Sequence, residues 1–205
     1  MRLNSRRLRR RVLPVRNPGG VIGTATVVAP GLALTALHVI TRDGPATLSV
    51  GEHARYPVAA VQSLPLAGYR DAGELARRSQ RYAEHLTGGP VDHALSTVDL
   101  ALLTVPGLPG PAVSPRGDPV SPGEHLVVPG YPGGYWSVNH GPVVGTDGAD
   151  FAVRMLLGPG ASGAPALDLH NRLAGVVTLD HHTATICVGP PLVSTFLYRF
   201  LTPRR

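Results

Sequence analysis

Three side chains in the sequence could together activate a nucleophile. His38 follows an apolar stretch, Asp99 heads a second one, and Ser162 lies in a loop rich in glycine. A serine hydroxyl is a weak nucleophile at neutral pH and needs an imidazole to accept its proton. The imidazole needs a carboxylate that fixes its tautomer and stabilises its positive charge. Each residue alone has an ordinary explanation, as a packed histidine, a strand cap or a solvated hydroxyl, but together they predict an acyl-transfer site.

The loop around Ser162 suits the same chemistry. Residues 158–165 read Gly-Pro-Gly-Ala-Ser-Gly-Ala-Pro. Glycines let the backbone turn so that consecutive N–H groups point at one spot, which is how a site for a developing oxyanion is built. The loop therefore predicts N–H donors beside the serine.

Four motifs occur in the order that they have in the trypsin-like peptidases, and the chain resembles this family over about residues 20 to 200. Within the family it is most similar to the HtrA-type domains of bacteria, without a PDZ domain. The motifs are T-A-x-H-V at 35–39, D-[IL]-A-[LV]-[LI] at 99–103, G-[DE]-x-[VL]-x-x-x-G-[YN]-P-x-G at 123–134, and a match to N-P-G-N-S-G-G-P at 158–165.

The resemblance implies a role for each residue of the site. Ser162 would be the nucleophile, His38 the general base and then acid, and Asp99 the carboxylate that orients the imidazole. The N–H groups of Gly160 and Ser162 would hold the oxyanion. Asp92 is an alternative to Asp99, but no apolar strand follows it. The reaction needs no cofactor and no metal.

The resemblance also places the substrate. Thr178 would hydrogen-bond the catalytic aspartate and begin, with Leu179 and Asp180, the strand to which an extended peptide pairs. Leu156 would form an apolar floor of the primary specificity pocket, which favours a small or medium apolar side chain. Asp180 would lie at the lip, where it could narrow the pocket or attract a basic group. The adjacent His181 and His182 lack a second cluster at ligand spacing, so a solvated loop is expected there rather than a metal site.

Two positions depart from the family pattern. Ala161 replaces the aspartate that precedes the serine in digestive relatives, so activation by a newly freed N-terminus is not expected. Ala164 replaces the second glycine of S-G-G-P, and its methyl group could crowd the loop.

The elements that must position these residues are short strands joined by turns. Pro30 and Gly31 separate strands at 24–29 and 32–35, and 36–40 predicts a helical turn. Residues 71–86 have helical spacing and predict an inserted helix, and 193–201 predict a closing helix. Further strands are expected at 46–50, 58–63, 99–105, 125–129, 141–146, 151–156, 164–169, 173–178 and 184–188. The predicted fold is all-β, with two antiparallel six-stranded β-barrels of the chymotrypsin-like type.

Composition and charge predict the organisation of the chain. The net charge of +6 comes largely from the arginines before residue 17. We expect residues 1–19 to be a disordered basic arm, 20–110 the first barrel and 111–205 the second, with 105–122 as linker. Cys187 is the only cysteine and excludes an intramolecular disulfide, which favours the cytoplasm. Residues 21–40 are uncharged, but Pro30 and Gly31 interrupt them, so no membrane span or export signal is expected.

These observations favour a serine endopeptidase that acts on a polypeptide, with one dedicated partner protein of a bacterial signalling or defence system as the expected substrate. The alternative is a protease fold used as a binding or regulatory module, inactive or awaiting a partner, which Ala164, Asp180 and the predicted insertion favour. A second alternative is binding of nucleic acid or membrane through the basic arm.

Overall fold

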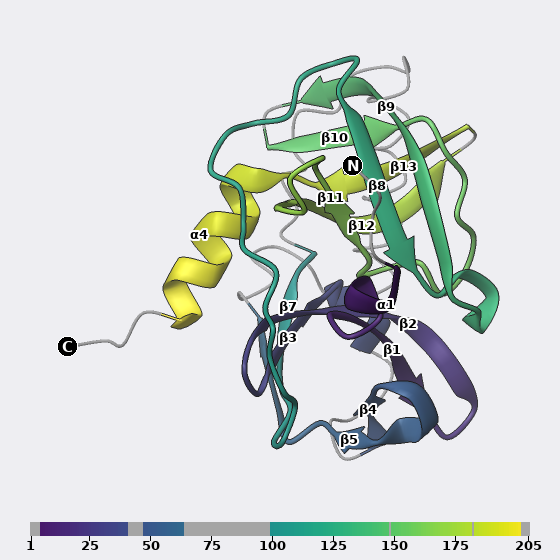
Figure 1. The fold of residues 1–205 in the computed structure, drawn as a ribbon, viewed down its shortest axis with the longest axis vertical. Helices are drawn as coiled ribbons and strands as arrows, with labels where there is room; N and C mark the ends of the chain where they lie inside the picture. The colour runs from purple at the N-terminus through teal and green to yellow at the C-terminus, as the bar shows by residue number, and fades with distance from the viewer. Residues whose placement is uncertain (1–4, 41–46, 64–98, 148, 182, 202–205) are drawn as a thin grey trace, which may run out of the picture.

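The structure is a computed structural model of the 205-residue chain, and it describes residues 5–40, 47–63, 99–147, 149–181 and 183–201. The predicted helical insertion at 71–86 and Asp92 lie outside the described residues. Two β units lie one above the other in Figure 1, and helix α4 packs along one side.

The N-terminal unit is a seven-stranded sheet. Its strand order is β5-β4-β1-β2-β3-β7-β6. The strands are β1 (Val12–Asn17), β2 (Gly20–Ala29), β3 (Leu32–Thr35), β4 (Ser49–Val50), β5 (Tyr56–Pro57), β6 (Ala60–Ser63) and β7 (Ala101–Thr104). Helices α1 (Ser5–Leu8) and α2 (Leu37–Ile40) and the 3₁₀ helix η2 (Glu52–Ala54) accompany them. The β2–β3 hairpin turns at Gly31, whose φ of 75° favours glycine.

The C-terminal unit is a closed six-stranded barrel with the order β10-β13-β12-β11-β8-β9. Its strands are β8 (His125–Gly130), β9 (Ser137–Asp147), β10 (Asp150–Val153), β11 (Pro165–Leu167), β12 (Leu173–His181) and β13 (Ala184–Val188). The 3₁₀ helix η3 (Pro132–Gly134) follows β8, and α4 (Pro190–Leu201) follows β13. No helix among the described residues is long and apolar enough to cross a membrane.

Apolar side chains form a core inside each unit and a third cluster between them. The third cluster joins strands of both units to α4, and Leu8 of α1 is part of it. Burial at this junction fixes the two units against each other, because separating them would expose the apolar surface to water.

The all-β prediction with a closing helix is confirmed. The prediction of a disordered arm is wrong for residues 5–19, since β1 pairs with both β2 and β4. Leu8, Val12 and Val15 are buried. Six arginines before residue 12 obscured the apolar alternation that follows them.

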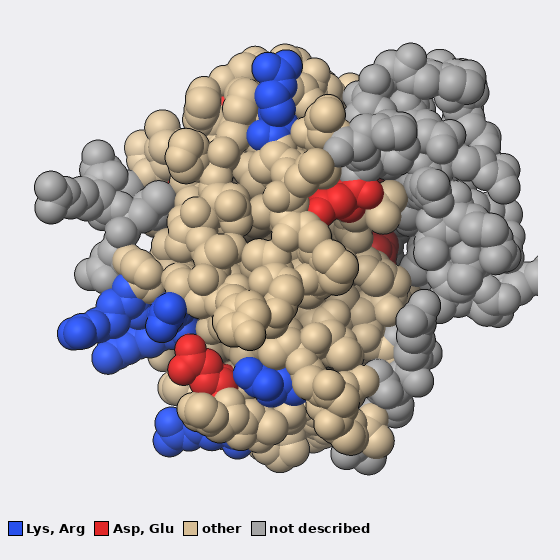
Figure 2. Space-filling model, turned by 90° about the vertical axis from the view of Figure 1, so that its right-hand side faces the viewer, with Lys and Arg blue, Asp and Glu red and all other residues tan. Residues whose placement is uncertain are grey.

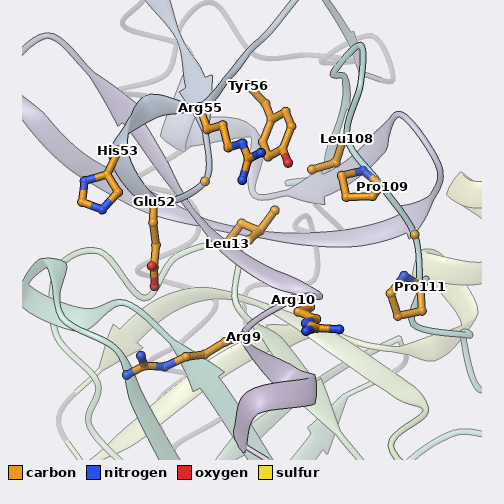
Figure 3. Close-up of a pocket in the computed structure, with 12 residues that line it drawn as sticks. Arg9, Arg10, Leu13, Glu52, His53, Arg55, Tyr56, Leu108, Pro109 and Pro111 are labelled. Carbon is orange, nitrogen blue, oxygen red and sulfur yellow. The ribbon is translucent and has the colours of Figure 1, made fainter.

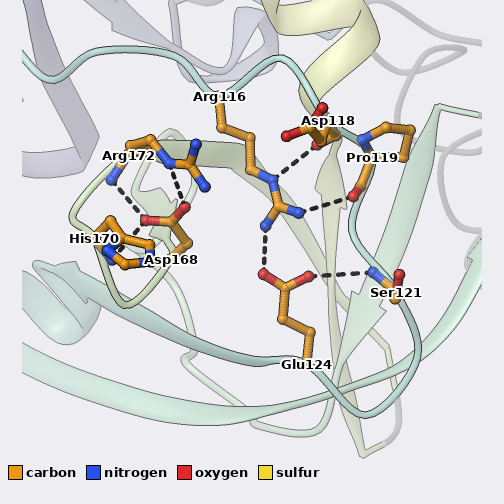
Figure 4. Close-up of polar contacts among 8 residues, drawn as sticks. All are labelled: Arg116, Asp118, Pro119, Ser121, Glu124, Asp168, His170 and Arg172. Carbon is orange, nitrogen blue, oxygen red and sulfur yellow. Dashed lines mark hydrogen bonds and ion pairs between the residues drawn. The ribbon is translucent and has the colours of Figure 1, made fainter.

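The segment between β7 and β8 is held by a buried arginine. The Arg116 guanidinium pairs with Glu124 and donates to the carbonyls of Asp118 and Pro119 at 2.8 and 2.9 Å (Figure 4). The Arg116 N–H donates to the carbonyl of Leu173 in the second barrel. These bonds let a segment rich in Pro and Gly follow one path across the surface.

Candidate active site

The first pair of site residues is brought together by strand pairing. β3 and β7 are antiparallel, with Thr35 opposite Ala101. Asp99 therefore stands just before β7 where the chain leaves β3, and it meets His38 in the first turn after that strand. The His38 N–H donates to Asp99 Oδ1 at 2.9 Å, and His38 Nδ1 lies 2.7 Å from Asp99 Oδ2.

The environments of these two side chains differ. Asp99 is 2% exposed, whereas the His38 side chain is 29% exposed. A carboxylate that accepts from Nδ1 places the ring proton there and leaves Nε2 as the basic nitrogen. Because both oxygens of Asp99 bind one residue, the imidazole is fixed in orientation as well as in tautomer.

Ser162 lies after a tight turn of the second barrel. The Ala161 N–H donates to the Gly158 carbonyl at 3.3 Å, and Gly160 in this turn has a φ of 92°. The Pro159 carbonyl accepts from the Gly133 N–H at 2.7 Å. Since the carbonyl and N–H of one peptide point in opposite directions, this bond turns the Gly160 N–H away from Gly133.

The N–H groups of Gly160 and Ser162 donate to no other group in the described part of the chain. Backbone N–H groups within a packed loop are normally paired. Two unpaired N–H groups beside one pocket are therefore typical of a site that binds a negatively charged oxygen. The Ser162 hydroxyl donates to the Thr178 carbonyl across a long 3.4 Å.

His38 and Ser162 face one pocket of about 260 Å³. Its lining is contributed by α2, the turn before Ser162 and the C-terminal part of β12: His38, Gly158, Pro159, Ala161, Ser162, Val177, Thr178, Leu179 and Asp180. The structure thus brings together residues more than 100 positions apart in sequence.

Thr24 of β2 holds the loop in place, and sequence reasoning missed it. Its N–H donates to the Ser162 carbonyl at 2.8 Å, and its hydroxyl donates to the Gly160 carbonyl at 2.8 Å. The same hydroxyl accepts from the Tyr131 N–H at 3.1 Å, and the Thr24 carbonyl accepts from the Thr35 hydroxyl. A threonine in a strand of alternating small residues gives no local signal of these contacts, which depend on how the two units pack.

Close packing explains why this loop needs glycine. Gly163 has a φ of 85°, and a Cβ there would lie 2.1 Å from the Thr24 carbonyl oxygen. The methyl of Ala164, which the sequence suggested could crowd the loop, is fully buried beside Gly130. A Cβ on Gly130 would lie 3.0 Å from the Ala164 Cβ, so the glycine in β8 provides the space for the alanine.

The structure places some of the predicted substrate residues at the pocket and others away from it. Thr178, Leu179 and Asp180 line the pocket, but Leu156 does not, and its side chain is 59% exposed. The expected bond from Thr178 to Asp99 is not formed, because the Thr178 hydroxyl donates to the Ile186 carbonyl at 3.2 Å. A register shift between Val177 and Leu179 in β12 accompanies this turn of the side chain.

Asp180 reaches back into the loop that precedes the serine. Its Oδ2 accepts from the N–H groups of Leu157 and Gly158, the former at 2.9 Å, and its Oδ1 contacts the Thr185 hydroxyl. These bonds hold the carboxylate at one end of the pocket, where it does not extend into solvent. A substrate side chain entering beside it meets less space and a fixed negative charge.

Cys187 belongs to the core rather than to this site. It is fully buried on β13, and burial raises the pKa of its thiol, followed by the negative charges of Asp150 and Asp180. A thiol in such surroundings stays protonated and is a poor nucleophile.

The chain is similar to known proteins by family model and by fold. The model of a family described as trypsin-like peptidase domain matches residues 23–176. A search of curated proteins found no match. Among solved structures, the active form of the Rv3671c protease of M. tuberculosis is 21% identical, with a TM-score of 0.68 over 96% of this chain and 83% of that one.

Two further structures extend the comparison. The human heparin binding protein is 13% identical, with a TM-score of 0.69 over 97% of this chain and 94% of that one. A Glu endopeptidase is 17% identical, with a TM-score of 0.67 over 94% and 91%. At these identities the likeness establishes the chymotrypsin-like fold.

Proposed function

The chain belongs to the trypsin-like peptidase domain family, and we propose that it is a serine endopeptidase with Ser162 as nucleophile, His38 as general base and Asp99 as the orienting carboxylate. The observation that carries the proposal is the pairing of a buried carboxylate with both the N–H and Nδ1 of His38, on the wall of the pocket that Ser162 faces. With the Nδ1 proton directed at Asp99, Nε2 is the basic nitrogen of the ring.

The reaction begins when the substrate carbonyl enters the pocket. Ser162 Oγ leaves its long bond to the Thr178 carbonyl and attacks the carbon, while its proton passes to His38 Nε2. The N–H groups of Gly160 and Ser162 stabilise the negative oxygen that forms. His38 then gives the proton to the leaving amine, and the C-terminal product departs.

Water completes the cycle. His38 takes a proton from the water that attacks the acyl-enzyme ester, and it returns this proton to Ser162 when the N-terminal product leaves. The peptide is held by main-chain hydrogen bonds along the part of β12 from Thr178 to Asp180.

A fluorophosphonate probe tests this proposal, because it forms a covalent bond only with an activated serine. We expect labelling of the wild-type chain and no labelling of Ser162→Ala. In His38→Ala, both labelling and turnover of a peptide substrate should be slower by several orders of magnitude. The variants must retain the wild-type circular dichroism spectrum. A folded wild-type chain that is not labelled, with or without candidate partner proteins, would refute the proposal.

We also propose the HtrA-type subclass, which the motif at 123–134 supports. In cells that express the chain, comparing new peptide termini between wild type and Ser162→Ala would identify the substrate. One dominant cleaved protein is expected, and broad degradation would contradict a dedicated partner.

The competing candidate is a binding module. The fixed Asp180 carboxylate inside the pocket favours it, and so does the occurrence of this fold in a protein that is named for binding heparin. The labelling experiment separates the two functions, since a module without an activated serine would not react.

A further inference from the structure

A second pocket lies on the N-terminal unit, and it shares no lining residue with the pocket at Ser162. Its volume is about 620 Å³, which is within the range of roughly 300 to 1,000 Å³ found for ligand sites. The segment before β1, the η2 turn and the stretch that follows β7 surround it (Figure 3).

The polar part of this pocket is dominated by arginine. Arg9 and Arg10 lie on one side and Arg55 on the other, as Figure 3 shows. None of the three forms an ion pair with a carboxylate of the described residues, and the guanidinium groups of Arg9 and Arg55 instead lie over aromatic rings at 5.3 and 5.5 Å. Exposed arginines without a carboxylate partner are available to an anionic ligand.

Among the described lining residues, Glu52 is the one carboxylate, against three arginines. Glu52 lies near the buried Tyr131, and burial together with the Glu52 charge raises the pKa of Tyr131 to about 12. Arginines gather in the lower part of the face shown in Figure 2, around one acidic patch, and that part holds the N-terminal unit. The field at the pocket is therefore positive.

The rest of the pocket is apolar and offers backbone groups. Leu13, Tyr56, Leu108, Pro109 and Pro111 supply the apolar wall. From Pro109 to Pro111 the backbone makes no hydrogen bond to another described residue, so the Gly110 N–H and three carbonyls are available. Free backbone donors and acceptors beside an apolar wall suit an extended peptide better than a compact small molecule.

The backbone that presents Arg55 is strained. His53 and Ala54 have φ values of 60° and 53°, in the left-handed region that side chains with a Cβ disfavour. Two such residues in succession persist only where the surroundings maintain them, and this strain concentrates at binding sites. The turn sets Arg55 opposite Arg9 and Arg10 across the pocket.

We propose that this pocket binds an acidic peptide segment of a partner or substrate protein, with carboxylates on the three arginines and an apolar side chain against the wall of Leu13 and Leu108. The site is independent of the reaction at Ser162. Nucleic acid fits less well, because successive bases need a row of exposed aromatic faces. The described lining offers two rings, and one of them, Tyr56, is covered by Arg55, which leaves only the imidazole of His53.

The test is binding of a fluorescein-labelled peptide in which glutamates flank one tryptophan, measured by fluorescence anisotropy on the full chain. Replacing Arg10 and Arg55 together by alanine should weaken binding roughly tenfold, since each exposed charge pair contributes modestly. The matched control replaces Arg154 and Arg199, which are also exposed, and should leave binding unchanged. Ser162→Ala should bind as the wild type does, which separates this site from the proposed catalysis.

Three results with the peptide would overturn the proposal, and a fourth with a polysaccharide would reassign the pocket. The first is no binding at millimolar peptide, and the second is equal binding by the variant without Arg10 and Arg55. The third is equal binding of the same peptide with glutamine in place of glutamate. Tighter binding of a heparin oligosaccharide than of the peptide, lost in the same variant, would assign the pocket to polysaccharide anions instead.

Discussion

Replacing Thr24 by valine should damage the nucleophile loop without changing the shape of the side chain. Thr24 is fully buried, and its hydroxyl both donates to the Gly160 carbonyl and accepts from the Tyr131 N–H. Valine is nearly isosteric with threonine but has neither function. Both partner groups would be left unpaired, the Tyr131 N–H in buried surroundings and the Gly160 carbonyl in partly buried ones.

The expected magnitude follows from those two groups. An unpaired buried polar group costs about 1–3 kcal/mol. Since the Gly160 carbonyl is only partly buried, we expect Thr24→Val to lower the free energy of unfolding by roughly 2–4 kcal/mol, the lower part of the range for two groups. In a chain of this length that corresponds to a fall in Tm of about 5–15 °C. Because the turn that presents the Gly160 N–H loses an anchor, fluorophosphonate labelling should slow by about tenfold or more, short of the 10²–10³ for complete loss of an oxyanion donor.

The chain offers a matched control two residues along the same strand. Thr26 is also fully buried, but its hydroxyl has no hydrogen-bond partner among the described residues. Thr26→Val removes an unpaired polar atom, so stability should be unchanged or increase by up to about 1 kcal/mol. Thr24→Ser keeps the hydroxyl and should restore most of the labelling rate. Wild-type labelling and stability in Thr24→Val, or an equal loss in Thr26→Val, would refute the reasoning.

Three further predictions follow from other contacts. Asp180→Ala frees the backbone N–H groups that its carboxylate now occupies, so cleavage after glutamate should rise roughly tenfold relative to cleavage after alanine in a peptide library, and an unchanged profile would contradict this. Gly163→Ala should cost about 4 kcal/mol or more in urea unfolding because its methyl meets backbone, whereas Gly107→Ala, at a φ of 75° with open space around it, should cost about 1 kcal/mol. Burial raises the pKa of Asp168, but the hydrogen bonds from the backbone and side chain of Arg172 and from the backbone of His170 outweigh it and hold the pKa below its usual value (Figure 4). The stability that Asp168 contributes is therefore present at neutral pH and is lost as the pH falls below about 4. Compared with the wild type, Asp168→Asn should have a lower free energy of unfolding at pH 7, and that free energy should change less between pH 7 and acid pH.

Patterns local in sequence were sufficient for much of the fold. The Pro30–Gly31 turn, the apolar strands and the closing helix were predictable because turn chemistry and apolar alternation act over a few residues. The β1 strand was not, because arginines precede it and Pro14 interrupts its pattern. Its place in the sheet is set by pairing with β2 and β4, which is a tertiary effect.

At the site, too, local motifs were predictable from the sequence and tertiary contacts were not. His38 and Asp99 could be placed together because each follows or heads a strand with a distinctive motif. The direction of the Thr178 hydroxyl and the exposure of Leu156 could not, since a register shift in β12 and the packing of a loop decide them. The fixed position of Asp180 likewise depends on N–H groups more than twenty residues away.

The dependence of the site on Thr24 has a wider consequence. The loop from Gly158 to Gly163 contains three glycines at positive φ, so its conformational entropy is high when it is not held. Backbone and hydroxyl groups of Thr24, a residue of the N-terminal unit, bind the carbonyls of Gly160 and Ser162 on the C-terminal unit. The N–H groups that would receive an oxyanion are therefore oriented by contact between the two units rather than by either alone. Any change that weakens the apolar junction around Leu8 and α4 should lower fluorophosphonate reactivity before it unfolds either unit, because the loop depends on hydrogen bonds that cross from one unit to the other.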